Sequence, residues 1–155
     1  MSFVVRPATR ADLPLLVAFN AAMALETEDL RLQPARLQAG VAAALADPQR
    51  GVYRVAELGG RPAGALLLTR EWSDWRNGWF LWIQSVYVAP EARRRGVYRA
   101  LHADVLAGAA AAGDVVGVRL YVDRANAGAQ RTYERLGMRR ARYDFFEASL
   151  ERTAT

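Results

Sequence analysis

The chain has 155 residues, of which 52% are hydrophobic and 24% are charged, and this composition predicts a single globular domain over residues 1–155. It contains no cysteine and a single histidine, His102, which excludes a disulfide framework and a metal site built from thiolates or several histidines; no metal is expected. The net charge of +5 comes from 21 basic residues, all arginine, against 16 acidic ones, which excludes lysine Schiff-base and P-loop lysine chemistry and reflects either an anionic partner or a compositional bias.

The N-terminal segment predicts neither a leader nor a membrane anchor. Residues 1–7 lack the basic start and apolar core of a signal peptide, and no apolar run in the chain reaches the roughly 18 residues of a membrane span. We therefore expect a cytoplasmic protein without a membrane partner.

Apolar periodicity and turn residues divide the rest of the chain into strands and helices. Apolar runs predict strands at residues 3–6, 52–56, 63–70, 79–88, 116–122 and within 139–150. Helical spacing and capping residues predict a helix that begins between Pro7 and Pro14, another that begins at Pro34, and two more at residues 95–112 and 126–136. Residues 71–78 are expected to form a polar and aromatic connection. Hairpins followed by a βαβ crossover indicate a mixed α/β domain.

Residues 84–101 place the end of a strand, three consecutive arginines and a glycine directly before a helix. The first amides of a helix have no carbonyl partners and its dipole is positive there, Gly96 allows close backbone approach, and arginine adds charge-assisted hydrogen bonds. This combination suits a pyrophosphate. The alternatives are a solvated basic turn and a nucleic-acid surface, and the second lacks another basic cluster with exposed aromatic residues.

The same segment resembles motif A of the GNAT acetyltransferases, Gln/Arg-x-x-Gly-x-Gly/Ala. Arg93 and Gly96 match the first two fixed positions, whereas Tyr98 stands where the family usually has glycine or alanine. The resemblance implies a bulge in the strand near Gln84 and Ser85, and a gap beside it that admits acetyl-CoA. It further implies a set of cofactor-binding residues: Val86, Tyr87, Val88, Arg93, Arg94, Arg95, Gly96, Val97, Tyr98 and Arg99.

A second segment resembles motif B of the same family, and its five characteristic positions are filled by Asn126, Ala129, Tyr133, Gly137 and Met138. Asn126 and Tyr133 are about two helical turns apart and share one face. The resemblance implies that Asn126 binds the cofactor and that Tyr133 contacts it as the general acid for the coenzyme A thiolate, since a phenol with a pKa near 10 keeps its proton. The alternatives are a simple helix cap and a core aromatic residue.

Together the two motifs and the element order cover nearly the whole chain. They imply the GNAT fold, an α/β (mixed α+β) architecture with a central, twisted, mostly antiparallel sheet of about six or seven strands. The sheet is expected to splay between strands 4 and 5 and to be flanked by about four helices. The implied reaction is direct transfer of an acetyl group from acetyl-CoA to a primary amine of a small molecule or peptide. An acyl-CoA-binding regulatory module without turnover is the alternative.

The attacking amine must lose a proton to a carboxylate or to an ordered water. Candidate bases are acidic residues near predicted chain turns: Glu26, Glu28, Glu71 and Asp74. Gln84 is an amide and cannot act as a base, but the acidic patch at residues 26–29 and the tryptophans could surround a cationic amine. The expected substrate-binding residues are Glu26, Trp72, Trp75 and Gln84.

Two features remain open at this level. His102 is expected to serve helix packing or to lie on the surface, not to take part in catalysis. Tyr143, Phe145 and Phe146 on the predicted terminal strand form either the surface of a possible homodimer or a buried strand face.

Overall fold

The computed structural model describes residues 2–150 and divides the chain into two compact units between Tyr121 and Val122. The first unit contains five strands and three α-helices, and the second contains the helix α4 (Ala127–Arg135). We describe each unit by itself, and the single domain over residues 1–155 stays a prediction.

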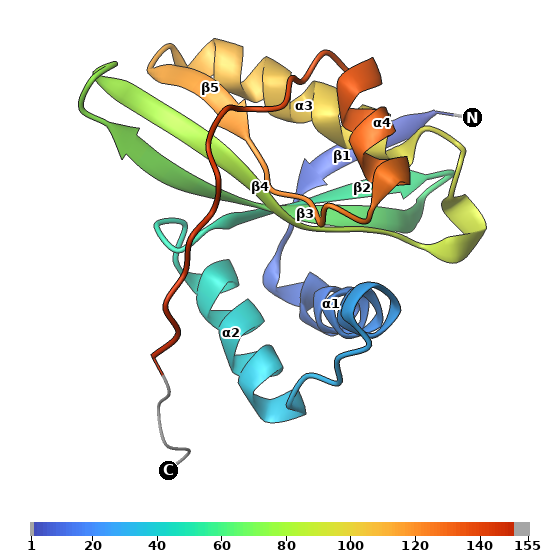
Figure 1. The fold of residues 1–155 in the computed structure, drawn as a ribbon. Coiled ribbons are helices and arrows are strands. Elements are labelled where there is room, and N and C mark those ends of the chain that lie inside the picture. The colour runs from blue at the N-terminus through green and yellow to red at the C-terminus, as the bar shows by residue number, and fades with distance from the viewer. Residues whose placement is uncertain (1, 151–155) are drawn as a thin grey trace. The chain divides into compact units, whose positions relative to one another are not determined.

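The first unit begins with β1 and then two helices before the main hairpins of the sheet (Figure 1). Short 3-10 helices at Arg10–Asp12 and Pro90–Ala92 lead into α1 and into the turn before α3. The bounds of the elements are β1 (Phe3–Pro7), α1 (Leu13–Glu28), α2 (Pro34–Ala46), β2 (Val52–Leu58), β3 (Arg61–Ser73), β4 (Gly78–Val88), α3 (Val97–Ala112) and β5 (Val115–Arg119).

The strands form one sheet in the order β1-β2-β3-β4-β5. All neighbouring pairs are antiparallel except β4 and β5, which are parallel because α3 crosses over between them. This confirms the predicted mixed α/β class and the mostly antiparallel sheet, although residues 2–150 form a sheet of five strands rather than six or seven.

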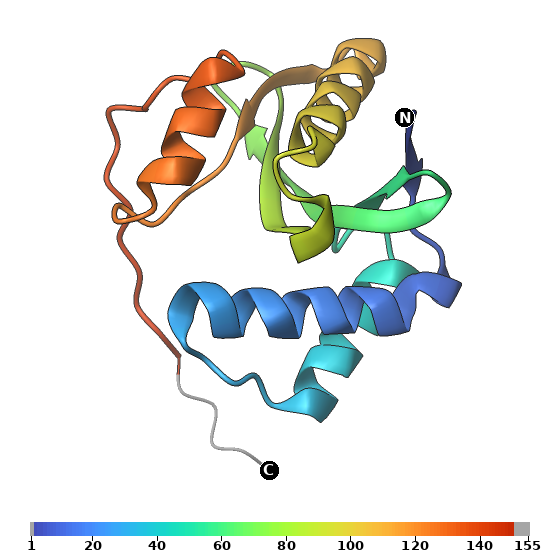
Figure 2. The same cartoon turned by 90° about the vertical axis from the view of Figure 1, so that its right-hand side faces the viewer.

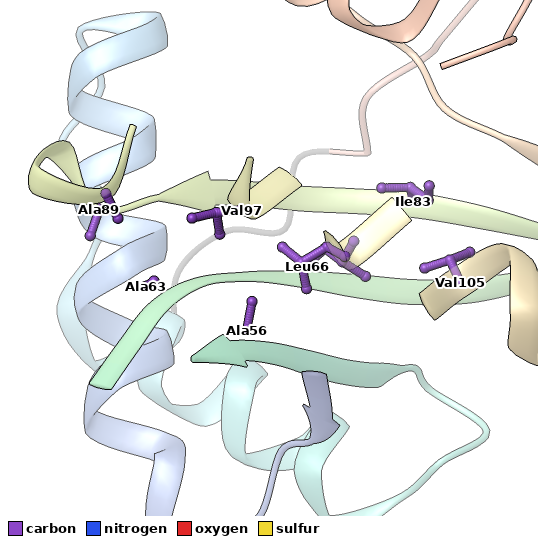
Figure 3. Close-up of a cluster of buried hydrophobic side chains, with 9 residues drawn as sticks. Ala56, Ala63, Leu66, Ile83, Ala89, Val97 and Val105 are labelled. Atoms are coloured by element: carbon purple, nitrogen blue, oxygen red, sulfur yellow. The ribbon is translucent and has the colours of Figure 1, made fainter. Parts of the chain in front are cut away.

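The helices of the first unit cover both faces of this sheet (Figure 2). Leu16 of α1 and Val41 of α2 pack with Tyr53, Val55 and Ala65 on one face. On the other face α3 lies over a larger cluster, which is drawn in Figure 3. Its members are buried side chains from the sheet, from residues 89–92 and from α3: Ala56, Ala63, Leu66, Ile83, Ala89, Ala92, Val97, Leu101 and Val105.

The expected connection at residues 71–78 is wrong, because β3 continues to Ser73 and a short turn leads directly into β4 at Gly78. Trp72 and Trp79 lie opposite each other in this hairpin with ring centroids 4.9 Å apart. A cross-strand aromatic pair of this kind stabilises a sheet. Glu71 and Trp72 therefore lie on a strand and not in a loop.

The predicted strand within residues 139–150 is also wrong, since the described part of this segment is irregular. A strand needs a neighbour for its main-chain groups, whereas side chains tie this segment to its own unit. Arg140 donates to Gln130 at 2.8 Å, and Arg124 pairs with Asp144 at 3.2 Å. Phe146 is 92% exposed, so a buried strand face for the aromatic residues is not observed.

Over residues 2–150, the helices are all too short or too polar to cross a lipid bilayer.

Candidate active site

The strand β4 contains a bulge at the position where the sequence predicts one. Tyr87 pairs with Ala65 and Gln84 pairs with Leu67, so β4 has one more residue than β3 between these two pairs. Ser85 takes up the extra length with a φ of 50°, in the left-handed region that residues other than glycine rarely adopt. A bulge bends its strand and interrupts the ladder, so the main chain of β4 changes direction here.

Beyond the middle of β4 the sheet opens on the β5 side. The parallel ladder ends at the pair Trp82 and Arg119, whereas β4 continues to Val88. Among the described residues no strand pairs with this edge of β4 after Trp82. This confirms the predicted splay between strands 4 and 5. Main-chain groups on such an edge can hydrogen-bond an extended ligand.

The turn that follows β4 presents a helix N-terminus surrounded by arginine. Gly96 is the N-cap of α3 with a φ of 90°, and Arg94 has a φ of 61°. A Cβ at Gly96 would meet only ordinary contacts, the nearest at 3.8 Å, so backbone conformation rather than space requires glycine here. The first amides of α3, from Val97 onward, have no carbonyl partners within the helix, and Arg94 and Arg99 are exposed beside them. These groups can bind an anion.

The side chains of Val97 and Tyr98 have different surroundings. Val97 is buried in the core beneath α3, so only its main chain can face a ligand. The Tyr98 hydroxyl lies 3.5 Å from Nδ1 of His102, one helical turn further on. His102 is buried, and burial lowers its pKa, which agrees with the packing role predicted for it.

The turn at residues 93–96, which we call the arginine turn, is joined to the end of α1 through Glu26. Arg93 Nη2 donates to Glu26 Oε2 at 2.7 Å, and the Tyr87 hydroxyl donates to Glu26 Oε1 at 3.1 Å. Arg93 holds the pKa of the Glu26 carboxyl below its ordinary value. Glu26 and Glu28 lie in the last turn of α1, whereas the sequence placed them after that helix. The structure thus unites a predicted substrate residue with two predicted cofactor residues.

On the face of the sheet shared with α1, a second carboxylate is also paired with arginine. Glu71 accepts from Arg119 at 2.8 Å and from the indole N–H of Trp82 at 3.2 Å. Closer to the bulge, Gln84 donates to the Thr69 hydroxyl. Neither Glu26 nor Glu71 is therefore an isolated negative charge.

The remaining residues that were predicted to bind the amine or to accept its proton lie at the end of the β3–β4 hairpin that is farthest from the bulge. Asp74 and Trp75 are in the turn between β3 and β4, and Trp75 is 88% exposed. From Gly78 to Gln84 the strand advances by roughly 20 Å, at about 3.3 Å per residue. Trp72 packs on Trp79 near the same end. The structure does not bring these side chains to the bulge.

In the second unit the motif B residues form a capped helix. Asn126 Oδ1 accepts from the Ala129 amide at 3.1 Å, which leaves its side-chain amide hydrogens available to a ligand. Gly137, with a φ of 89°, ends the helix, and the Met138 amide bonds the Tyr133 carbonyl at 3.0 Å in a Schellman-type cap. Tyr133 is half-buried, and burial raises its pKa. Its phenol is therefore protonated at neutral pH.

Three residues of this region were not singled out by the sequence. Phe19 packs on Tyr87 with centroids 5.0 Å apart, and Arg119 pairs with Glu71. A Cβ on Gly64 would come within 2.7 Å of the Tyr87 carbonyl oxygen. Of these, only Arg119 had a signal, because a charged residue alternating with valine and leucine marks the outward face of a strand.

A pocket of about 530 Å³ lies on the α3 side of the sheet, and Thr69, which accepts a hydrogen bond from Gln84, is among its lining residues. It is lined by residues such as Arg54, Leu68, Leu81 and Asp104, and none of the predicted site residues lines it. The pocket therefore plays no part in the site described here.

Comparison with known proteins agrees with this geometry. Residues 19–138 match the model of the acetyltransferase (GNAT) family. The crystal structure of a possible acetyltransferase from Clostridium difficile 630 is 38% identical, with a TM-score of 0.91 over 98% of this chain and 100% of that one. A search of the curated proteins found no match.

Two more distant crystal structures share the fold, each at 16% identity. One is a ribosomal-protein-alanine N-acetyltransferase from Brucella melitensis biovar Abortus 2308, with a TM-score of 0.77 over 97% of this chain and 100% of that one. The other is a predicted acetyltransferase with acetyl-CoA from Clostridium acetobutylicum, with a TM-score of 0.75 over 96% of each chain. With the bulged β4, the arginine turn and the family match over residues 19–138, this chain belongs to the GNAT acetyltransferase family.

Proposed function

We propose that the chain is an acetyl-CoA-dependent N-acetyltransferase that acts on a primary amine of a small molecule or peptide. The observation that carries this proposal is the succession of an open strand edge, an arginine turn and a helix N-terminus within one unit. An extended chain with a pyrophosphate at one end is complementary to that arrangement.

The residues of the turn fit coenzyme A in charge and in shape. In the proposed complex, the main chain of Val86 and Val88 on β4 bonds the pantetheine arm. Gly96 and the first amides of α3 bind the pyrophosphate, with Arg94 and Arg99 supplying positive charge. The position of Asn126 in motif B implies that its side-chain amide also binds the cofactor.

Acetyl-CoA supplies a thioester whose acetyl group passes to an amine, so that a C–N bond forms and a C–S bond breaks. We assign Tyr133 the proton that the departing thiolate requires, because burial keeps its phenol protonated. We assign the proton of the attacking amine to an ordered water, because Glu26 and Glu71 are each paired with an arginine, Glu28 is exposed at the end of α1, and Asp74 lies at the hairpin tip.

The test combines calorimetry with a thiol-release assay. Coenzyme A titrated into the protein is expected to give saturable heat with one site per chain. A panel of primary amines with acetyl-CoA is expected to include acceptors that release thiol. Absence of heat would overturn the proposal, whereas heat with no thiol release from any amine would favour the regulatory module.

A further inference from the structure

The last turn of α1 carries a carboxylate where a helix is least able to tolerate one. Glu26 lies near the C-terminus of α1, the negative end of the helix dipole, and the last turn contains no basic residue. The charge that offsets it comes from Arg93, 67 positions away in sequence. Both side chains are 42% exposed, so the contact is not a consequence of burial.

Arg93 is turned back toward β4 by its other contacts. Its Nε donates to the Val88 carbonyl at 3.1 Å, and its guanidinium carbon lies 5.6 Å from the centroid of the Tyr87 ring. With Nη2 on Glu26, two of its nitrogens are engaged on the strand and on α1. The first arginine of the turn thus binds protein groups, while Arg94 and Gly96 follow with left-handed φ angles of 61° and 90°.

Tyr87 completes the connection. Its ring is buried against Phe19 of α1, and its hydroxyl donates to the same carboxylate. Glu26 therefore joins α1 to β4 just beyond the bulge and to the first residue of the arginine turn. We call Glu26, Tyr87 and Arg93 the α1 latch.

We propose that the α1 latch positions the arginine turn for binding the cofactor. Glu26 is then a positioning residue, and Arg93 acts through Glu26 rather than as a phosphate ligand. This inference rests on the proposed binding of coenzyme A. Its physical basis is that Arg93 is the fixed end of a short turn whose next residue, Arg94, adopts a left-handed φ that is unfavourable for a residue other than glycine. A turn anchored at that end holds its amides in the binding arrangement before the ligand arrives.

Electrostatics and positioning predict opposite results for Glu26→Gln. Removing a negative charge near the turn strengthens the attraction for an anionic ligand if charge alone matters. Under the proposal the same substitution loosens Arg93 and weakens binding. We expect the Kd for coenzyme A and the KM for acetyl-CoA to rise about fivefold, in the range of coupled networks, with kcat changed by less than about twofold. The control is Glu28→Gln, which removes the same charge from the same helical turn.

A double-mutant cycle separates the latch from direct phosphate binding by Arg93. We expect Arg93→Gln to weaken coenzyme A binding by a similar factor, and the double variant to bind no more weakly than either single variant. Multiplicative effects, or a Glu26→Gln variant that binds as well as or better than the wild type, would overturn the latch. Thermal unfolding of each variant identifies loss of the fold. If wild-type protein does not bind coenzyme A, the proposed function fails instead.

Discussion

Glu71 and Arg119 form an ion pair across β4, with Oε1 and Nη1 2.8 Å apart, and the Arg119 guanidinium carbon lies 3.5 Å from the centroid of the Phe80 ring. The Phe80 ring lies over β5 at Gly117, where a Cβ would come within 2.7 Å of it. Because Gly117 has no side chain, the Phe80 ring can lie against β5 and beneath the Arg119 guanidinium. The Glu71 carboxylate, which the sequence suggested as a general base, is thus held by Arg119.

Replacement of Glu71 by glutamine is expected to have a modest effect on turnover. General-base catalysis contributes about 100-fold or more to a rate, whereas loss of a paired surface charge changes it by less than about tenfold. The measurement is kcat/KM as a function of pH for Glu71→Gln, with Asp74→Asn at the hairpin tip as the control. A loss of about 100-fold with a flattened acidic limb would identify Glu71 as the base.

The Tyr133→Phe variant is expected to bind coenzyme A as the wild type does but to turn over about 100-fold more slowly, because it cannot donate a proton. Because burial raises the pKa of Tyr133, the wild-type rate is expected to decline only at pH values above the ordinary phenol range. Steady-state kinetics and calorimetry on the same samples test both statements. Tyr143→Phe, an exposed substitution in the same unit, is the matched control. An unchanged kcat would remove Tyr133 from the mechanism.

Gly96→Ala is expected to weaken coenzyme A binding about tenfold and to destabilise the fold by about 1–2 kcal/mol, because a Cβ is unfavourable at a left-handed φ. The paired control is Gly40→Ala in α2, where a Cβ meets nothing within 4 Å. That substitution is expected to stabilise the protein by up to about 1 kcal/mol through helix propensity. Urea unfolding and calorimetry distinguish the two, and equal behaviour at both positions would contradict the role of Gly96.

The ion pair between Arg6 and Asp12 is expected to make stability depend on acid. Arg6 donates to both carboxylate oxygens of Asp12 at 2.8 and 2.9 Å, and the Thr9 amide donates to one of them at 2.7 Å. These contacts lower the pKa of Asp12 in the folded state. The stabilisation is therefore complete above the ordinary aspartate pKa, about 3.9, and is lost as the pH falls through the lower folded value.

The Asp12→Asn variant is expected to lose about 1.5–3 kcal/mol of unfolding free energy at pH 7, the usual contribution of hydrogen bonds to a charged group. The difference from the wild type should shrink as the pH falls below about 4, because the wild-type carboxyl then becomes protonated. Urea titrations at several pH values measure this. A difference that is independent of pH would show that the charge of Asp12 is not involved.

Local sequence signals were sufficient to predict where α3 begins and where α4 begins and ends. Gly96 and the arginines predicted the start of α3, and an asparagine followed by a glycine bounded α4, because caps depend on the chemistry of adjacent residues. The sequence predicts a shorter β3–β4 hairpin than the structure has, because serine, aspartate, asparagine and glycine near residues 73–78 indicate a loop. Cross-strand packing of Trp72 on Trp79 carries the strands further than those residues suggest.

The sequence by itself determined the class of the fold and the arginine turn, since each depends on residues near one another in the chain, and its resemblance to motif A of the GNAT family implied the position of the bulge. Tertiary structure alone decided which charges meet. Arg93 finds Glu26 across 67 positions and Arg119 finds Glu71 across 48. A charged side chain reaches in any direction allowed by its rotamers, so its partner follows from the packing of α1 and β5 around β4 and not from a local pattern.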